Sequence, residues 1–279
     1  MKVPVTILIP VLNEEANLPR CIASVAWADE IVVIDSHSPD LTAAVAESLG
    51  ARVVQFDFNG TWPKKRNWAL ENVTFRNAWI FILDADETLP PDAAEELRAV
   101  AEGDQKLDAY WVNRKFMFLD RWLNHAYYPN WILRFFRHGK ARYAKLSDAA
   151  MNATDNEVHE PMLVDGETGR LRSEILHYAF PTIDTFVHRH NLYSNWEAHV
   201  ALADDGSAGA RGLKPALKRI FRHLPCRPLL RFLYVYVWQR GFLDGREGYY
   251  FARLHGVYEF LNVAKTYELR KKQHADAGK

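Results

Sequence analysis

Short apolar runs alternate in the first half of the chain with segments whose apolar residues recur every three or four positions. The apolar runs cover residues 3–11, 31–34, 52–56 and 78–83. Runs of this kind are typical of strands buried on both faces of a parallel sheet. The segments with helical spacing cover residues 15–25, 41–49 and 64–71. This alternation predicts βαβ units, and hence an α/β fold with right-handed crossovers.

The fourth apolar run ends abruptly in three acidic residues, Asp84, Asp86 and Glu87. Ligands of open α/β sheets collect just past the carboxyl ends of the strands, where these acids would lie. Carboxylates suit Mg²⁺ or Mn²⁺, which in turn bind diphosphates, so the pattern indicates a nucleotide-activated substrate. The alternative is structural, because acids also stabilise the start of a helix such as the one expected at 90–97.

The first predicted strand-to-helix turn, Pro10–Glu14, contains no glycine. Dinucleotide-binding and P-loop sites cradle phosphates with glycine-rich turns, so the sequence of this turn argues against both. The glycine-rich opening expected of sugar nucleotidyltransferases is missing as well. A bound diphosphate would therefore be neutralised mainly by a cation and by basic side chains.

Several motifs, in this order, resemble a known enzyme family. Four of them resemble the signatures of family 2 glycosyltransferases with the GT-A fold: Pro10–Glu15, Ile34–Thr42, Lys65–Leu70 and Asp84–Glu87. Later segments resemble one branch, the lipopolysaccharide-core β-1,4-glucosyltransferase-like enzymes: Tyr128–Arg137, Val158–Glu160 and Ile175–Tyr178. The resemblance implies a GT-A nucleotide-diphospho-sugar transferase fold, with a mostly parallel central sheet flanked by helices. It also implies inverting, metal-dependent transfer of a hexose, with UDP-glucose as the expected donor and a glycolipid or lipopolysaccharide-core oligosaccharide as the acceptor.

Carried over to matching positions, the resemblance implies a donor site at the ends of the first strands. The residues expected to line the nucleoside pocket are Pro10, Val11, Asn13 and Glu14. Asp35 would accept a hydrogen bond from the base, expected to be uracil. Lys65 and Arg66 would approach the phosphates; the alternative, a solvated helix start, is weakened because cations there oppose the helix dipole. His37 is a departure, because many relatives have glycine at this position.

The resemblance further implies a divalent metal, Mn²⁺ or Mg²⁺, bound near the donor diphosphate. Asp84 and Asp86 match the metal motif, with Asp86 expected to coordinate directly and Asp84 to contact the ribose or a metal-bound water. Together with Ala85 between them, they are also expected to line the nucleotide-sugar site. His177 resembles a late histidine that completes the metal shell. His159 is the competing residue, and a histidine among apolar neighbours is often an ordinary core residue.

Inverting transfer also needs a base for the acceptor hydroxyl. Glu160, which follows the metal strand as in the family, is the expected base, and Glu157 is its competitor. As a structural alternative, either glutamate would only pair with His159 or an arginine. Two rival functions remain open: a catalytically inactive GT-A domain that serves as a membrane-docked assembly partner, and a sugar nucleotidyltransferase.

The formal net charge is zero, with 35 Lys and Arg against 35 Asp and Glu, so the chain has no overall charge that would favour nucleic acid. Residues 211–246 are nevertheless basic and aromatic, with one acid, Asp244. Their basic residues are Arg211, Lys214, Lys218, Arg219, Arg222, Arg227, Arg231, Arg240 and Arg246. The apolar stretch at 228–240 is too short to span a bilayer but suits an anionic membrane surface. The alternative is a helical subdomain that packs its aromatics on the core.

A glycine-rich break at 203–212 predicts two domains, a catalytic domain at 1–205 and a helical extension at 206–279. Two distant cysteines, Cys21 and Cys226, give no disulfide framework. The apolar start lacks a small-residue cleavage site and is interpreted as the first strand. The expected location is therefore cytoplasmic, peripheral on the inner face of the cytoplasmic membrane.

Overall fold

The structure is a computed structural model that describes residues 2–103, 106–145, 155, 160–206 and 226–277. It divides into two compact units. The first takes in Met1–Lys115, Pro129–Ser147 and Thr154–Ala179, and the second takes in Phe116–Tyr128, Asp148–Ala153 and Phe180–Lys279. The predicted domain boundary after residue 205 falls inside the second unit. The assignment of catalysis to residues 1–205 and of a helical extension to residues 206–279 stays a prediction.

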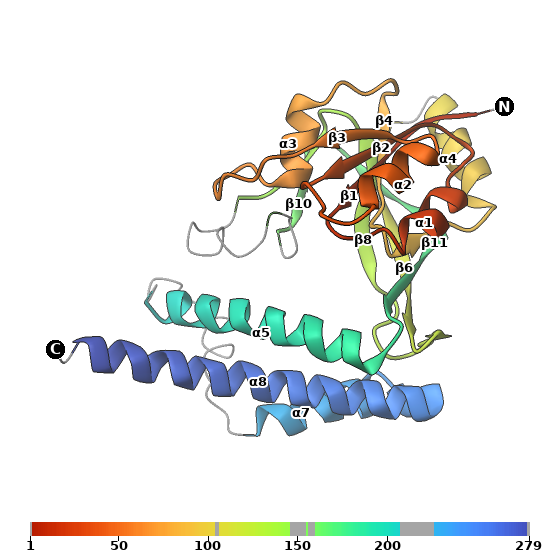
Figure 1. The fold of residues 1–279 in the computed structure, drawn as a ribbon. Helices are drawn as coiled ribbons and strands as arrows, with labels where there is room; N and C mark the ends of the chain where they lie inside the picture. The colour runs from red at the N-terminus through yellow and green to blue at the C-terminus, as the bar shows by residue number, and fades with distance from the viewer. Residues whose placement is uncertain (1, 104–105, 146–154, 156–159, 207–225, 278–279) are drawn as a thin grey trace. The chain divides into compact units, whose positions relative to one another are not determined.

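A mixed sheet forms the core of the first unit (Figure 1). The strands of this sheet are β1 (Val3–Val11), β2 (Ala28–Asp35), β3 (Arg52–Gln55), β4 (Trp79–Ile82), β5 (Glu87–Thr88), β6 (Ala109–Phe118), β7 (Arg121–Trp122), β8 (Trp131–Arg137) and β11 (Thr168–Phe180). Their order is β3-β2-β1-β4-β8-β6-β11-β5, with β7 paired to β6. The first four strands are parallel, as predicted, whereas β8 pairs antiparallel with both β4 and β6.

Four helices and a two-stranded sheet flank the first half of the sheet. They are α1 (Leu18–Ser24), α2 (Thr42–Ser48), α3 (Lys65–Asn72), α4 (Ala93–Glu102), β9 (Ala141–Tyr143) and β10 (Met162–Val164). Residues of α1, α2 and α4 pack with one face of the sheet in one apolar cluster. Residues of α3, β9 and β10 pack with the other face in a second cluster.

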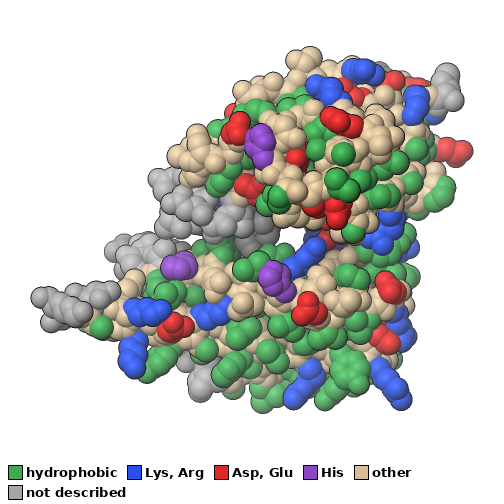
Figure 2. Space-filling model, in the orientation of Figure 1, with side chains coloured by type: hydrophobic (Ala, Val, Ile, Leu, Met, Phe, Trp, Pro, Cys, Tyr) green, Lys and Arg blue, Asp and Glu red, His purple; other side chains and the backbone are tan. Residues whose placement is uncertain are grey.

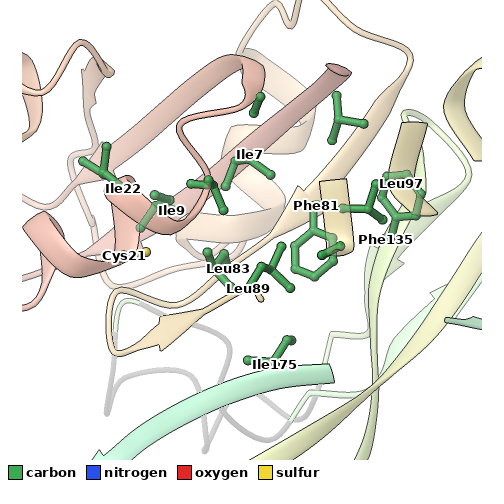
Figure 3. Packing of buried hydrophobic residues seen from close by; sticks show 14 of the residues in the cluster. Ile7, Ile9, Cys21, Ile22, Phe81, Leu83, Leu89, Leu97, Phe135 and Ile175 are labelled. Atoms are coloured by element: carbon green, nitrogen blue, oxygen red, sulfur yellow. The ribbon is translucent and has the colours of Figure 1, made fainter. Parts of the chain in front are cut away.

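The central strands are buried on both faces, which explains their continuous apolar sequence. Ile7 and Ile9 of β1 lie in the first cluster, whereas Leu8 between them lies in the second. Figure 3 shows the first cluster, where Phe81 of β4 and Leu97 of α4 lie among these side chains. Each such fully buried side chain contributes roughly 1.5–3 kcal/mol to folding. The burial fixes the strand ends from which the polar residues project.

The second unit is mainly helical. Its helices are α5 (Ile183–Gly206), α7 (Arg227–Leu233), the π-helical turn η2 (Tyr234–Trp238), the 3-10 turn η3 (Gly241–Asp244) and α8 (Gly245–Ala277). Helix α8 packs along α5 and α7 (Figure 1). Two histidines, His190 and His255, are buried among Phe186 and Phe251, and burial lowers the pKa of His190 to about 4. No helix in the described part of the chain has the length and apolar character needed to cross a membrane.

Candidate active site

The carboxyl ends of β1, β2 and β4 meet at one edge of the sheet. Val11 is in register with Asp35, and Leu8 is in register with Ile82. Asp84 therefore follows β4 at the same edge at which β1 and β2 end. The structure thus brings together the loops after these three strands, where the sequence analysis placed the donor site and the acidic motif.

A second strand pairing places His177 beside the acidic motif. Glu87 in β5 is in register with His177 in β11, and the amide of Tyr178 donates to the carbonyl of Asp86 over 2.8 Å. As a result, the His177 Nε2 atom lies 3.4 Å from Oδ1 of Asp86. Two of the predicted metal ligands are therefore neighbours, although 91 positions separate them in the sequence.

Two arginines bind the carboxylate of Asp84. Arg66, from the first turn of α3, bonds its Oδ1 atom, and Arg134 of β8 bonds Oδ2 at 2.5 Å. Burial by itself would raise the pKa of Asp84, but Arg134 and then Arg66 outweigh it and hold the pKa well below its ordinary value. The side chain is therefore a carboxylate whose charge is balanced by the protein itself.

Arg134 reaches Asp84 because β8 is irregular at this residue. The pairing with β6 passes from Tyr110 opposite Phe135 to Trp111 opposite Leu133, which leaves Arg134 as the extra residue of a bulge. Bulges re-aim side chains and are common beside active sites. The sequence alone gives Arg134 no role. A charged residue inside the apolar segment 132–136 was the available signal.

Glu87, the third acid of the motif, has a structural role that the sequence alone does not indicate. Its side chain is fully buried, and its Oε2 atom accepts the Asp84 amide at 3.0 Å. Arg114 and Arg134 lie 3.5 and 3.9 Å from its Oε1 atom. Glu87 therefore fixes the backbone of the acidic motif and places a negative charge beside Arg114 and Arg134.

The donor atoms near Asp86 fit a divalent metal in part. Asp86 supplies carboxylate oxygen and His177 supplies imidazole nitrogen, a mixture that suits Mn²⁺ and is tolerated by Mg²⁺. No group of three or more His, Cys, Asp or Glu residues gathers for a metal among the residues that the structure describes. Further ligands would thus have to come from a diphosphate and water, as is usual for Mg²⁺ sites. To coordinate the metal directly, Asp84 would have to give up its contact with one of the two arginines.

The predicted nucleoside side of the site is formed by the loops after β1 and β2. Asp35 is buried and accepts hydrogen bonds from Ser38, through the backbone amide and the hydroxyl, and from Gln55. The amide of Asn13 donates to the Ser38 hydroxyl at 2.9 Å, which ties the two loops together. His37 has a φ of 54°, so this turn keeps the left-handed conformation that glycine favours. Its ring contacts Asp57 at 2.8 Å.

The backbone of the β1 end and the following turn continues this side of the site. Pro10 is paired with Ile34 at the end of β1, next to Val11. The amide of Glu14 donates to the Thr42 hydroxyl at 2.8 Å. These contacts fix the positions expected to surround the nucleoside.

Lys64 and Lys65 bind carboxylates from a distant segment rather than lying in solvent. Lys65 Nζ donates to the Val11 carbonyl at 2.5 Å and pairs with Asp155 at 2.8 Å. Burial lowers the pKa of Lys65, and Asp155 opposes that shift. Lys64 Nζ pairs with the predicted base, Glu160, at 2.9 Å, and both side chains are buried. The competing residues at 157 and 159 lie outside the described residues.

A sequence model of glycosyl transferase family 2 matches residues 6–153, more than half of the 279 residues. The chain belongs to this family. It is a glycosyltransferase, and its predicted GT-A class is confirmed, with a mixed sheet, flanking helices and a long C-terminal helix. The match contains Asp35, Arg66 and the acidic motif, whereas Glu160 and His177 lie beyond it.

Relatives of this glycosyltransferase match nearly its full length. A lipopolysaccharide core biosynthesis glycosyltransferase of Rhizobium meliloti is 28% identical over 96% of this chain and 93% of its own. An uncharacterized glycosyltransferase of Rickettsia bellii is 26% identical over 92% of this chain and 84% of its own. Among solved structures, a mannosyltransferase of Pyrobaculum calidifontis in complex with GDP-Man and Mn²⁺ is 14% identical, with a TM-score of 0.49 over 95% of this chain and 87% of its own.

Proposed function

We propose that this glycosyltransferase moves a hexose, with inversion, from UDP-glucose onto a glycolipid or lipopolysaccharide-core acceptor, with the help of Mn²⁺ or Mg²⁺. The observation that carries the proposal is the juxtaposition of Asp86 with His177, beside an arginine-bound Asp84, at the edge where β1 and β2 also end. The named Rhizobium meliloti relative supports the choice of acceptor.

The donor would lie across the ends of β1, β2 and β4. Asp35, buried at the end of β2, would accept the imide N–H of uracil. Arg66 is the phosphate-binding candidate, because it lies in the first turn of α3 and its guanidinium is already at the acidic motif. Transfer of one Arg66 contact from Asp84 to a diphosphate oxygen would leave Arg134 to balance Asp84.

Asp86 and His177 would hold the metal, with Asp84 contacting the ribose or a metal-bound water. When bound, the divalent ion would supply positive charge for the departing diphosphate. Cys21 lies next to this motif, and its thiol is 3.6 Å from the Asp84 carbonyl. Burial raises the pKa of Cys21, followed by the charges of Glu87, Asp86 and Asp84, so the thiol stays protonated and does not compete as a ligand.

Glu160 is the proposed base. Inverting transfer is a single displacement in which a carboxylate removes the acceptor hydroxyl proton as the sugar is transferred. Lys64 holds the Glu160 Oε1 atom at 2.9 Å, which fixes the carboxylate in one orientation. Glu157 remains the alternative.

The second unit is the proposed membrane-binding part, on the cytoplasmic face of the membrane. Large hydrophobic side chains of α7, η2, η3 and α8 are exposed, and Trp238 reaches 80%. The others are Leu229, Leu233, Tyr234, Val237, Phe242, Leu243, Tyr249, Tyr250, Val257, Phe260 and Tyr267. Figure 2 shows hydrophobic side chains mixed with lysines and arginines over this unit. That mixture suits an anionic bilayer surface, where a lipid-linked acceptor would be presented.

The proposal is tested by incubating the purified chain with Mn²⁺ and a panel of nucleotide sugars, with and without a lipopolysaccharide-core acceptor. Release of UDP from UDP-glucose, dependent on metal and acceptor, is the expected result. Because the glucose of UDP-glucose is α-linked and the transfer is proposed to invert this configuration, NMR of the product should show a β linkage. Release of pyrophosphate in a parallel incubation with UTP and glucose 1-phosphate would instead favour a nucleotidyltransferase, and neither product nor metal-dependent UDP binding would favour an inactive domain.

A further inference from the structure

Two tryptophans line an open cavity of about 560 Å³ over the adjacent strands β8, β6 and β11. The lining residues are Trp111, Trp131, Thr168, Gly169 and Arg170. All of them belong to the first unit, and none has a role in the donor site described above. Trp111 is 36% exposed and is the only aromatic residue among the large exposed hydrophobic side chains of the described first unit.

Both ends of the cavity are ordered by contacts within the protein. The Trp111 indole N–H donates to the Thr168 hydroxyl at 3.3 Å, which orients the ring. The Arg170 guanidinium lies 4.8 Å from the centre of the Trp131 ring, within the range of a cation–π contact. An exposed arginine and an exposed indole are thus held in place before any ligand arrives, which reduces the ordering cost of binding.

Gly169 explains how the start of β11 lies close to its neighbour. A Cβ atom at this position would come within 2.7 Å of Leu107 and 2.9 Å of the Tyr110 ring. The glycine therefore allows Thr168 and Arg170 to lie close to β6, beside Trp111. The close packing of these two strands therefore places the lining residues of the cavity side by side.

The chemistry of the lining selects a class of ligand. An indole face binds the C–H groups of a sugar ring, because the face of the π system carries partial negative charge. A guanidinium binds carboxylate or phosphate with parallel N–H donors. None of the described lining residues is acidic, so this part of the wall carries no negative charge that would repel an anion.

The cavity lies on a strand that also supplies the active site. Trp131 begins β8, and Arg134, which binds Asp84, is three residues further on. At about 3.3 Å per residue, the two positions are roughly 10 Å apart along the strand. An oligosaccharide acceptor could span this distance, with one residue in the cavity and another near the acidic motif.

We propose that this cavity is a binding subsite for an anionic saccharide, a sugar residue that stacks on Trp111 and directs a phosphate or carboxylate to Arg170. The proposal rests on the proposed transferase function in so far as the saccharide is part of the acceptor. It adds a site that recognises the acceptor away from the transferred hexose.

The test is direct binding, measured by isothermal titration calorimetry on the full chain without donor. The probe is a delipidated, phosphorylated lipopolysaccharide-core oligosaccharide, compared with its dephosphorylated and its carboxyl-reduced forms. The variants are Arg170→Gln and Trp111→Leu, which keeps an apolar side chain. Arg172→Gln is the matched control, because Arg172 is on the same strand with a side chain that is 94% exposed.

We expect Trp111→Leu to weaken binding of all three probes by about tenfold or more, which corresponds to about 1.4 kcal/mol. Arg170→Gln should weaken binding of the unmodified probe by a similar factor. It should have little effect on binding of the modified probe that lacks the recognised anion. Arg172→Gln should change binding less than twofold. The subsite is refuted if the wild-type chain does not bind, if both cavity variants bind as the wild type does, or if Arg172→Gln has the same effect as Arg170→Gln.

Donor turnover on the same samples separates this inference from the proposed function. If the wild-type chain releases no UDP but shows the expected binding pattern, the proposed transfer is wrong and the subsite stands. If transfer occurs and the acceptor KM is unchanged in both cavity variants, the subsite is wrong and the transfer stands.

Discussion

Replacement of Arg134 by methionine should strongly destabilise the first unit. Arg134 is 5% exposed, bonds Asp84 at 2.5 Å and lies 3.9 Å from the fully buried Glu87. Methionine keeps much of the side-chain volume but leaves two buried carboxylates with less positive charge around them. Breaking a buried pair by removal of one partner costs about 3–5 kcal/mol. That is a large part of the roughly 5–15 kcal/mol that stabilises a typical domain.

The measurement is urea unfolding of the wild type, Arg134→Met, Asp84→Asn and the double variant. If the pair is coupled, the double variant should be more stable than the sum of the single losses predicts, by about 0.5–3 kcal/mol. Arg142→Met is the matched control. Arg142 pairs with Asp165 at 2.6 Å, but both side chains are more than half exposed, so the loss should be about 0–1 kcal/mol.

The dependence on pH gives a second, independent test of the same reasoning. The arginines hold the pKa of Asp84 below its unfolded value, so the pair stabilises the protein above about pH 4 and loses this contribution as the pH falls further. Loss of Arg134 raises the pKa of Asp84 and removes part of that dependence. The gap in stability between the wild type and Arg134→Met should therefore narrow between pH 5 and pH 3. A loss no larger than that of Arg142→Met, or a gap independent of pH, would refute the argument.

Further predictions concern catalysis, the second unit and the membrane. Asp86→Ala should abolish Mn²⁺-dependent binding of UDP in calorimetry, and full retention would remove Asp86 from the metal shell. Glu160→Gln should leave UDP-glucose affinity nearly intact and reduce turnover by roughly 10² to 10⁴, whereas an unchanged rate would shift the base to Glu157. His190 and His255 are buried and have lowered pKa values, so the unfolded chain binds protons more readily than the folded second unit does. The free energy of unfolding of this unit should therefore fall by about 1.4 kcal/mol per histidine and pH unit as the pH falls from about 6.5 towards 4. Thermal unfolding that does not change over this range would contradict the buried, neutral state. Trp238→Ser should weaken binding to anionic vesicles in a sedimentation assay, and Asp86→Ala, a change at a buried residue of the first unit, is the control. If Trp238→Ser binds the vesicles as the wild type does, Trp238 is not part of the membrane-binding surface.

The parallel half of the fold could be predicted because each element there carries a local signal. The run 3–11 forms β1 over the same residues, and the run 78–83 forms β4 with one residue fewer at each end. Both strands are buried on two faces, so their apolar character is continuous and easy to detect. The acidic motif follows β4 directly, and its place at the sheet edge follows from the strand.

The antiparallel half was not predicted, because its strands depend on distant partners. β8 pairs with β4 and β6, and β11 pairs with β5, which is only two residues long. No local periodicity indicates such pairings. The role of Arg134 depends on a bulge in one of them, and the role of Asp155 depends on contact with Lys65 across 90 positions. His177 was selected through resemblance and its neighbours in the structure agree with that choice, although its role stays a prediction.

The two aspartates of the acidic motif differ because of what surrounds each of them. Asp84 has an arginine on each oxygen, and the backbone amide of the same residue is held by Glu87. Asp86 faces an imidazole at 3.4 Å instead, a nitrogen ligand that can share a metal with a carboxylate. A cation arriving at this edge would meet less positive charge at Asp86 than at Asp84. The difference favours Asp86 over Asp84 as the direct ligand in the proposed metal site, and under the same proposal Arg134, in addition to Arg66, would keep Asp84 charged while the donor phosphates bind and leave.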